Sequence, residues 1–548
     1  MKKLLLSLVA VAACAPATFL NAEVTLDGHS ATPEQIAAIA GGESVKIAPD
    51  AMKRSEDAFR VLCKAAGEGQ MIYGLTVGVG LNKDRKFVDA KGELTQEVID
   101  ASSKFQTGLI RAHSGSVGPD MDIPTARATM AARLNMMLVG GAAVQIPVID
   151  AYVSFLNKGV TPCMPNNGSM GEADITICSH VGQAMIGEGE VYYKGKKVPA
   201  ADALKAIGMK PVKLFGKDAL AILSSNAYSV GMGCLALTDM AQFQKINTIA
   251  FALSIQGLNG NVSPFLEDTL ALHPFPETVK AGAEIRGLLQ GSSIWNRDDN
   301  RRLQDPLSYR DSVFTIGEVN RAYEAARFLF TVQLNSSDDN PGVAVNVTAK
   351  SGRYQEMKSY VTTSNGSGAV LPSANFEPLP WVIAFEQLGI AMAHNSITSA
   401  LRTTKLGTPD FTEGLERYLG TPKSYHAFGA MEKPPVTLAM ENKVLSMPVS
   451  CDFLPVAGQV EDVATNAPLV VERLHQQIDN SFWLLGIEMI HAAQAVDLRH
   501  QKTPDYQLSP ATLKLYQAIR AKVPMLDEDR SYTPDFRAAN EVMRTFHE

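Results

Sequence analysis

The sequence predicts a mainly α-helical protein, built around a bundle of long helices with a mixed region on its N-terminal side. Three long segments repeat apolar residues at helical spacing and contain few Gly or Pro breakers: residues 219–255, 382–404 and 460–498. Such lengths exceed those of ordinary globular helices and are typical of helical bundles, including bundles shared between subunits. Pro468 lies inside the third segment, so we expect a helix to begin or bend there.

The chain divides by pattern into an N-terminal region, residues 23–215, and a region of long and C-terminal helices, residues 216–548. The first region mixes short helical patterns with Gly and Pro. Its segment Glu190-Val191-Tyr192-Tyr193-Lys194-Gly195 predicts one small β-hairpin. We expect helix elsewhere.

Residues 1–22 predict an export signal that is removed from the mature protein. The basic start Met1-Lys2-Lys3 precedes an apolar run over residues 4–13, and small residues follow up to Ala22; this order is that of a secretory signal peptide. The alternative is a bacterial lipoprotein site, in which Cys14 becomes the lipidated first residue. In both cases the signal leads us to expect a periplasmic or secreted protein. No later segment has the roughly 20 uninterrupted apolar residues of a membrane span, so we expect the mature protein to be soluble or merely anchored.

The composition excludes some classes of function. A net charge of −7 argues against sequence-independent nucleic-acid binding, which requires a basic face. Beyond Cys14 the five cysteines are an odd number and form no C-x-x-C pair, so they indicate neither a disulfide framework nor a metal site. The ten histidines lack metal-ligand spacing. We expect no nucleic-acid partner and no metal.

Tyr73 begins a glycine-rich loop that runs to Gly80. Glycines permit close backbone approaches, so such a loop is able to wrap a small substrate. It is not a dinucleotide-binding fingerprint, because the G-x-G-x-x-G spacing and the βαβ context are missing. Alone, the loop is a weak indication of function.

The order and spacing of further motifs indicate a function for this loop. They are Arg111-Ala112-His113-Ser114-Gly115, then Arg127, Arg133 and Asn135, Asn167-Gly168-Ser169-Met170-Gly171, Gln304-Asp305-Pro306 with Arg310, Asn335-Ser336-Ser337-Asp338-Asp339-Asn340-Pro341, Asn375-Phe376, Glu441-Asn442-Lys443 and Gln459-Val460-Glu461-Asp462. Together they resemble the aromatic amino acid lyases, the family of histidine, phenylalanine and tyrosine ammonia-lyases, from about residue 30 to 520. The resemblance implies a mainly α-helical homotetramer whose active sites are built from three subunits, with several positive helix N-termini aimed at each site.

The resemblance also implies roles for individual residues. Tyr73 matches the base that removes a β-proton, and Arg310 matches the clamp that holds the substrate carboxylate through two hydrogen bonds. Lys405, at the end of a long helical segment, and Glu461 are the candidates for a general acid at the substrate ring. The other positions expected around the substrate are His113, Gln304, Asn340, Phe376 and Ser224, the last in the place of a family Asn.

One segment departs from the family pattern. Family members carry Ala-Ser-Gly, which cyclises into the electrophile methylidene-imidazolone, where this chain has Glu172-Ala173-Asp174. There is no serine to dehydrate, so we expect no such cofactor. Leu307 also replaces a family Tyr. We expect Glu172 and Asp174 to face a cationic group of the substrate, with a helix cap as the alternative for Asp174.

A substrate whose amine is already quaternary needs no electrophile, because it leaves as a neutral amine. The pattern therefore resembles the ergothionase branch of the family, which eliminates trimethylamine from ergothioneine, a betaine of histidine, to give thiol-urocanate. Aromatic faces also bind quaternary ammonium groups; Phe376, Tyr309 and Phe314 are candidates, with core packing as the alternative for each. Two other functions stay open: an ammonia-lyase acting on histidine or another aromatic amino acid, and a catalytically inactive periplasmic binding protein.

Overall fold

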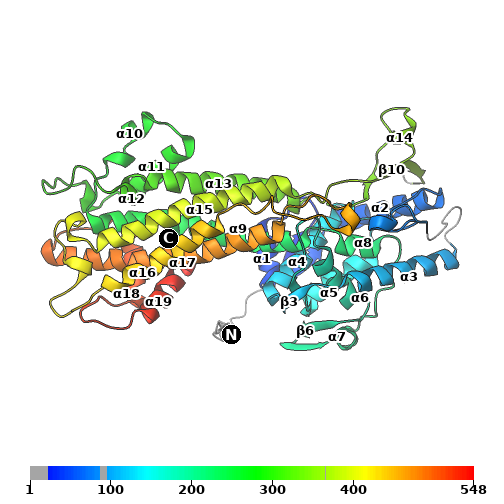
Figure 1. Cartoon of the computed structure of the whole chain (residues 1–548), viewed down its shortest axis with the longest axis horizontal. Coiled ribbons are helices and arrows are strands. Elements are labelled where there is room, and N and C mark those ends of the chain that lie inside the picture. The colour runs from blue at the N-terminus through cyan, green and yellow to red at the C-terminus, as the bar shows by residue number, and fades with distance from the viewer. Residues whose placement is uncertain (1–22, 87–94, 365, 548) are drawn as a thin grey trace.

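The computed structural model describes residues 23–86, 95–364 and 366–547. The predicted signal segment and Cys14 lie outside these residues. The described chain is elongated, with a bundle of long helices at one end and a region of shorter helices and small sheets at the other (Figure 1). The prediction of a mainly α-helical, long-helix bundle is confirmed.

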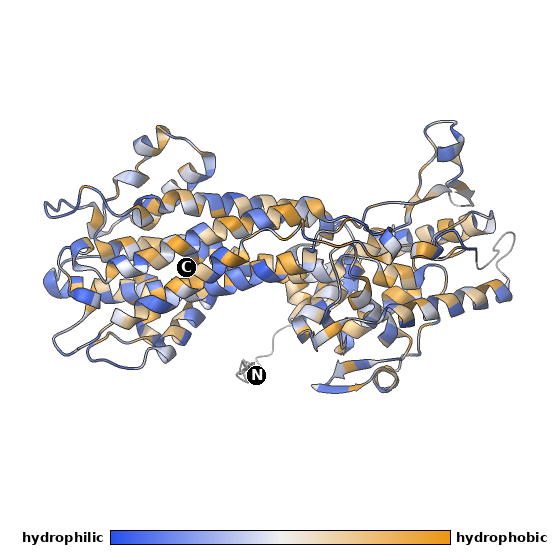
Figure 2. Cartoon of the chain, in the orientation of Figure 1, coloured by the Kyte–Doolittle hydropathy of each residue, from blue (hydrophilic) through white to orange (hydrophobic). Residues whose placement is uncertain are grey.

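Four long helices form the bundle: α9 (Ala227–Leu258), α13 (Ser312–Leu334), α15 (Leu379–Leu406) and α17 (Ala467–Lys502). Helix α17 packs against α9 and α15, and α13 packs against α15 and α9. Figure 2 shows hydrophilic and hydrophobic residues mixed along the bundle helices. The flanking helices are α10 (Glu267–Ala271), α11 (Pro276–Leu288), α12 (Leu307–Arg310), α16 (Lys433–Leu445), α18 (Pro510–Lys522) and α19 (Thr533–Thr545).

Helix α9 is the core helix of the molecule, and residues on all of its faces are buried. With the preceding α8 (Asp218–Leu223) it is long and apolar enough to cross a membrane, yet 83% of its most apolar window is buried inside the protein. A helix that is apolar all round must be covered by other elements. Here those elements include α17, α4 (Ile123–Leu138) and α1 (Pro33–Ala40).

The three long predicted helical segments are present, with shifted ends. The first divides at residues 224–226, where α8 ends and α9 begins. Pro468 lies in the first turn of α17 and so begins this helix, a place where the missing N–H of proline costs nothing. Residues 460–466 precede α17 and are not part of it.

The N-terminal region shares its core with the bundle. One cluster of buried apolar side chains includes residues from Val24 to Met543 and so crosses from one region into the other. The remaining helices of this region are α2 (Pro49–Gly67), α3 (Gln96–His113), α5 (Ile146–Lys158), α6 (Ile175–Met185) and α7 (Ala200–Ala206).

The predicted hairpin exists as β6 (Glu190–Tyr193) and β7 (Lys196–Pro199), but the expectation of helix everywhere else is wrong. Strand β4 (Val160–Pro162) pairs with β6, and β1 (Glu23–Leu26) runs parallel to β2 (Ser44–Ile47). The other pairs are β3 (Val117–Asp120) with β5 (Pro165–Asn167), and β10 (Gly366–Leu371) with β8 (Gly342–Val345) and β9 (Tyr360–Thr363), next to the short α14 (Tyr354–Met357). Strands of three to six residues are too short to show an alternating pattern.

Candidate active site

Tyr73 begins a loop that closes on itself. Its hydroxyl oxygen accepts a hydrogen bond from the Gly80 N–H (2.9 Å). Gly74 and Gly80 have φ angles of 75° and 55°, in the left-handed region that glycine adopts at little cost. Burial raises the pKa of Tyr73, the Gly80 N–H opposes this shift, and the nearby charge of Glu461 adds to it. The phenol is therefore held in a fixed place beside a carboxyl group.

The loop before α17 brings Glu461 to this place. Residues Ala457–Gln459 of this loop contact the end of the tyrosine loop at Gly80–Asn82. Burial raises the pKa of Glu461, and the charge of His113 lowers it. Three predicted residues, Tyr73, His113 and Glu461, therefore lie in one region.

Residues 170–174 lie where three helices begin: α6, α9 and α17. The Asn466 N–H, directly before α17, donates to the Met170 carbonyl (2.7 Å), and the Asp174 N–H donates to the Ser225 carbonyl, just before α9 (2.8 Å). The positive ends of the helices therefore meet at the segment that departs from the family pattern.

Asp174 does not face a substrate. It is fully buried, and its carboxylate accepts hydrogen bonds from the Ser229 N–H (2.9 Å) and the Ser169 hydroxyl (2.7 Å). Ser229 lies in the first turn of α9, so Asp174 caps α9 from outside, while its own helix α6 receives no side-chain cap. The expectation that Asp174 binds a cation is wrong, because its oxygens are engaged in structural hydrogen bonds.

Glu172 faces Glu377, a residue that the sequence analysis did not select. Burial raises the pKa of Glu172 to about 8, and the Glu377 carboxyl and the charge of Glu461 add to the shift. One carboxyl oxygen of Glu172 is buried without a hydrogen-bond partner among the described residues. Glu172 therefore has two carboxyl neighbours, Glu377 and Glu461, and Glu461 in turn lies near Tyr73. The available signal for Glu377 was its position directly after Asn375-Phe376.

Asn226 was also missed, although Ser224, two residues earlier, was selected. The Asn226 side-chain oxygen accepts a hydrogen bond from the Ala173 N–H (3.0 Å), and its amide donates to the Phe376 carbonyl. Asn226 therefore ties the segment of Glu172 to the segment of Glu377. Ser224 ends α8, with its N–H bonded to that helix.

A buried ion network fixes Asn340 beside these residues. Arg133 pairs with Asp338 (3.1 Å) and Asp339 (2.7 Å), and all three side chains are at most 1% exposed. The Asn340 side-chain oxygen accepts a hydrogen bond from the Ser373 N–H (3.0 Å), just before Phe376. The network thus anchors the segment that carries Phe376 to α4.

The other predicted residues lie at the opposite end of the bundle. Phe376 precedes α15 and Lys405 lies in its last turn, so the length of the helix separates them by about 40 Å. The Lys405 ammonium lies 4.6 Å from the centre of the Phe411 ring, and the Arg310 guanidinium donates to the Asp305 carbonyl (2.8 Å). Gln304 is exposed next to them. Figure 1 shows α12, which ends at Arg310, at the end of the molecule away from α6 and α8.

The aromatic candidates other than Phe376 belong to this far end too. Tyr309 is fully buried against Phe251, and its hydroxyl contacts that of Ser254 (3.1 Å). Of the two expectations for Tyr309, core packing is confirmed and a cation-binding face is wrong. Phe314 is 38% exposed and lies near His273.

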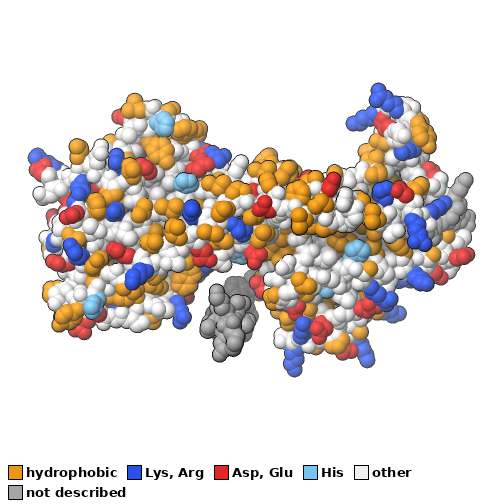
Figure 3. All heavy atoms as spheres, viewed as in Figure 1, with side chains coloured by type: hydrophobic (Ala, Val, Ile, Leu, Met, Phe, Trp, Pro, Cys, Tyr) orange, Lys and Arg blue, Asp and Glu red, His pale blue; other side chains and the backbone are white. Residues whose placement is uncertain are grey.

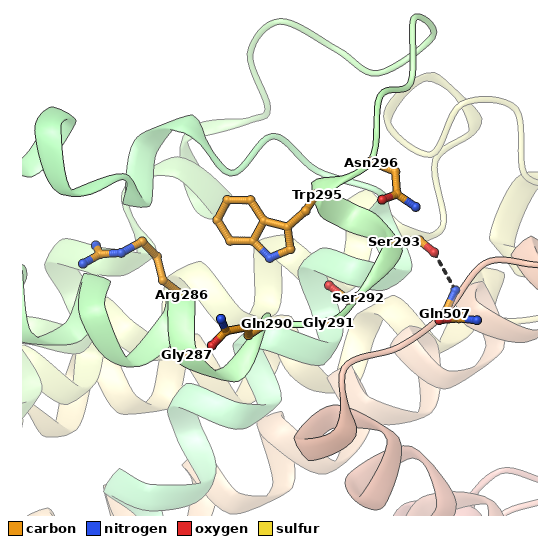
Figure 4. A pocket seen from close by; sticks show the side chains of 9 residues that line it. All are labelled: Arg286, Gly287, Gln290, Gly291, Ser292, Ser293, Trp295, Asn296 and Gln507. Carbon is orange, nitrogen blue, oxygen red and sulfur yellow. Dashed lines mark hydrogen bonds between the residues drawn. The ribbon is translucent and has the colours of Figure 1, made fainter.

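None of the predicted site residues lines the cavity of about 560 Å³ beside α11 (Figure 4). Its lining residues are Arg286, Gly287, Gln290, Gly291, Ser292, Ser293, Trp295, Asn296 and Gln507.

Asp239, His475 and Asp479 bring ligand atoms within 4.8 Å of one another between α9 and α17, although the sequence shows no metal-ligand spacing. These side chains already form ion pairs: His475 with Asp239 (3.3 Å) and Arg544 with Asp479 (2.8 Å). All five cysteines of the described residues are free.

Comparison with known proteins places the chain in a family. The model of the aromatic amino acid lyases matches residues 31–521. A histidine ammonia-lyase from Chloroflexus aurantiacus is 31% identical over 529 residues, which cover 95% of this chain and 96% of that protein.

Two similar solved structures are an ergothionase and a tyrosine aminomutase by name. The ergothionase of Treponema denticola, an ergothioneine-degrading enzyme solved with desmethyl-ergothioneine sulfonic acid, is 34% identical, with a TM-score of 0.83 over 96% of this chain and 99% of that chain. A tyrosine aminomutase from Streptomyces globisporus is 26% identical, with a TM-score of 0.83 over 95% of this chain and 97% of that chain. Because the family model matches nearly the whole chain, and the fold matches those of these enzymes, the chain belongs to the aromatic amino acid lyase family.

Proposed function

We propose that this lyase eliminates trimethylamine from a histidine betaine, ergothioneine first among them, and that it works without a methylidene-imidazolone group. The observation that carries the proposal is the place of Glu172. A carboxyl group, paired with Glu377, lies at the segment where the family forms its electrophile, within electrostatic reach of Glu461, which neighbours Tyr73. A cationic leaving group fits this environment, whereas an electrophile that accepts electrons does not.

The residues present do not fit the family's cofactor. Its ring requires a serine that loses water and a backbone nitrogen that attacks a carbonyl, whereas Glu172-Ala173-Asp174 contains no hydroxyl. The Ala173 N–H is bonded to Asn226 and the Asp174 N–H to the Ser225 carbonyl, so both nitrogens have structural roles. No step of the proposed reaction passes through such a group.

The proposed reaction is a 1,2-elimination. Tyr73, as the phenolate or through a relay, removes the β-proton, the electrons of that C–H bond form the new C=C bond, and the electrons of the Cα–N bond leave with neutral trimethylamine. Arg310 holds the carboxylate through two hydrogen bonds. Lys405 or Glu461 acts as the general acid that supports charge on the imidazole-2-thione ring.

We further propose that each active site combines residues from several copies of the chain. Tyr73 and Glu172 lie about 40 Å, one length of α15, from Lys405, so one copy does not bring them together. Apolar residues at spacings of four and seven run along α15 and are 37–43% exposed: Leu379, Ile383, Ile390, Ile397 and Leu401. Such a stripe is typical of a helix that packs against another helix. Figure 3 shows hydrophobic side chains along the middle of the bundle, which supports a homotetramer assembled through the long helices.

The proposed location is the periplasm or the exterior, reached through the signal in residues 1–22, with lipidation at Cys14 as the alternative. A lyase in that location acts on a betaine that enters from outside the cell.

A second candidate function is a histidine ammonia-lyase, favoured by the names of relatives such as that of Chloroflexus aurantiacus. One assay separates the candidates. The purified protein is incubated with ergothioneine, hercynine and histidine, and the ultraviolet band of the conjugated product and the released amine are followed. Trimethylamine release supports the proposal, ammonia release supports the second candidate, and binding without turnover indicates an inactive binding protein. Tyr73→Phe is expected to abolish turnover and to leave thermal unfolding unchanged; full activity in this variant removes Tyr73 from the mechanism.

A further inference from the structure

We infer that Glu377 is a selectivity residue of this active site: with Glu172 it forms a pair of carboxyl groups that receives the quaternary ammonium group of the substrate. This inference rests on the proposed function and adds to it. Neither the family match nor the sequence motifs selected Glu377.

The backbone determines the position of the pair. Asn226 joins the Ala173 N–H to the Phe376 carbonyl, so the residues next to these two, Glu172 and Glu377, are brought together. The Glu377 carboxylate also accepts a hydrogen bond from the Leu379 N–H (2.9 Å), at the first residue of α15. This helix end favours negative charge on Glu377. The fully buried Asn226 therefore positions the backbone next to both glutamates, and the start of α15 positions the Glu377 carboxylate.

Two ionised carboxyl groups side by side raise the free energy of the folded protein unless one of them is neutralised. Like charges at short distance in a partly buried place repel strongly, so one group keeps a proton or a cation lies between them. Glu172 holds the proton, as its raised pKa of about 8 indicates, since Glu377 lies at the helix start. Glu461 adds a third carboxyl group, and Tyr73 and His113 are the other titratable groups described around them.

A quaternary ammonium group is the cation that this pair suits. It has no N–H to donate, so hydrogen-bond acceptors give it no directional bonds and attraction depends on net negative charge and on contact with its methyl groups. A primary ammonium group would instead stay protonated beside the carboxyl groups and donate its N–H groups to their oxygens. One buried oxygen of Glu172 has no hydrogen-bond partner among the described residues, as expected for an oxygen that faces a cation without N–H groups. Phe376, which precedes Glu377 in the chain, is a candidate for an aromatic contact with the same cation.

The test measures binding, so it does not depend on turnover. Calorimetry on the whole assembled protein gives the Kd for tetramethylammonium, which carries only the quaternary cation, and for urocanate, which has the ring and carboxylate without an ammonium group. Glu377→Gln keeps an oxygen for the Leu379 N–H and removes one negative charge. We expect it to weaken tetramethylammonium binding by about tenfold or more and to leave urocanate binding unchanged.

Two controls keep the result clear. Glu356→Gln removes a carboxylate that likewise accepts a backbone N–H, from Ser351 (3.2 Å), but lies on α14 outside the pair, and is expected to leave both Kd values unchanged. Glu172→Gln replaces the carboxyl group that holds the proton, so it is expected to weaken tetramethylammonium binding only above about pH 8, where that proton is lost; measured at pH 9, it carries the test if Glu377→Gln fails to fold. Unchanged tetramethylammonium binding in the Glu377 variant, or equal weakening of both ligands, overturns the inference. Absence of trimethylamine release by the unmodified protein overturns the proposed function instead.

Discussion

Asn226→Ala is the sharpest test of how the candidate site is held together. The Asn226 side chain is fully buried and makes two hydrogen bonds, accepting from the Ala173 N–H (3.0 Å) and donating to the Phe376 carbonyl. Truncation removes both bonds and leaves two backbone groups without their partner, a loss of about 2–4 kcal/mol in the free energy of unfolding. The same truncation releases the segments of Glu172 and Glu377 from each other.

In free energy, the expected effect on catalysis is similar in size to the effect on stability, because 100-fold in rate is about 2.7 kcal/mol. A displacement of about 1 Å in a catalytic arrangement costs about 100-fold in rate, so we expect kcat/KM for trimethylamine release to fall by about that factor. Asn247→Ala is the matched control on the same helix. Asn247 is buried and exchanges two hydrogen bonds with Asn395 (3.2 and 3.1 Å), about 30 Å along α9 from Asn226.

Both variants are measured by thermal unfolding and by the ultraviolet band of the conjugated product. We expect both to lower Tm by a similar amount, and only Asn226→Ala to lower kcat/KM strongly. Equal losses of activity in the two variants would refute the role of Asn226 as the tie between the two segments, and so would an Asn226→Ala enzyme with unchanged kcat/KM.

Three further changes have expected outcomes. Gly171→Ala places a Cβ 2.4 Å from the Ala467 nitrogen at a φ of 89°, so backbone strain of about 1–3 kcal/mol plus this clash should lower Tm and activity, and an unchanged Tm would contradict the close approach. The folded-state pKa of Glu172 lies near 8 against an ordinary 4.5, so its bound proton stabilises the fold fully below pH 4.5 and this contribution is lost as the pH rises to about 8. Glu172→Gln should therefore gain thermal stability relative to the unmodified protein at pH 8.5 compared with pH 5; the same difference in Tm at both pH values would count against the burial of this carboxyl. Ile390→Glu combined with Ile397→Glu puts charges on the exposed stripe of α15 and should split the assembly in analytical ultracentrifugation with loss of activity, whereas an intact, active assembly would exclude that stripe from the interface.

The sequence by itself determined the family, the long helices and the missing serine. Apolar periodicity over dozens of residues is a local property, so the three long segments were visible without any knowledge of their neighbours, and Pro468 marked a helix start for a reason internal to proline. Residue identity alone shows that Glu172-Ala173-Asp174 lacks a hydroxyl. The short strands were not predicted, because segments of a few residues are too short to show an alternating pattern.

Only the tertiary structure decided which of the candidate residues meet. Asp174 and Glu172 are two residues apart, yet one caps α9 and the other faces Glu377, because the fold brings a helix start to one and a distant loop to the other. The same fold places Lys405 at the end of α15 that lies away from Glu377. Charge pairing, burial and side-chain hydrogen bonds depend on contacts between segments far apart in the chain. A local sequence pattern does not reveal which residues of distant segments make those contacts.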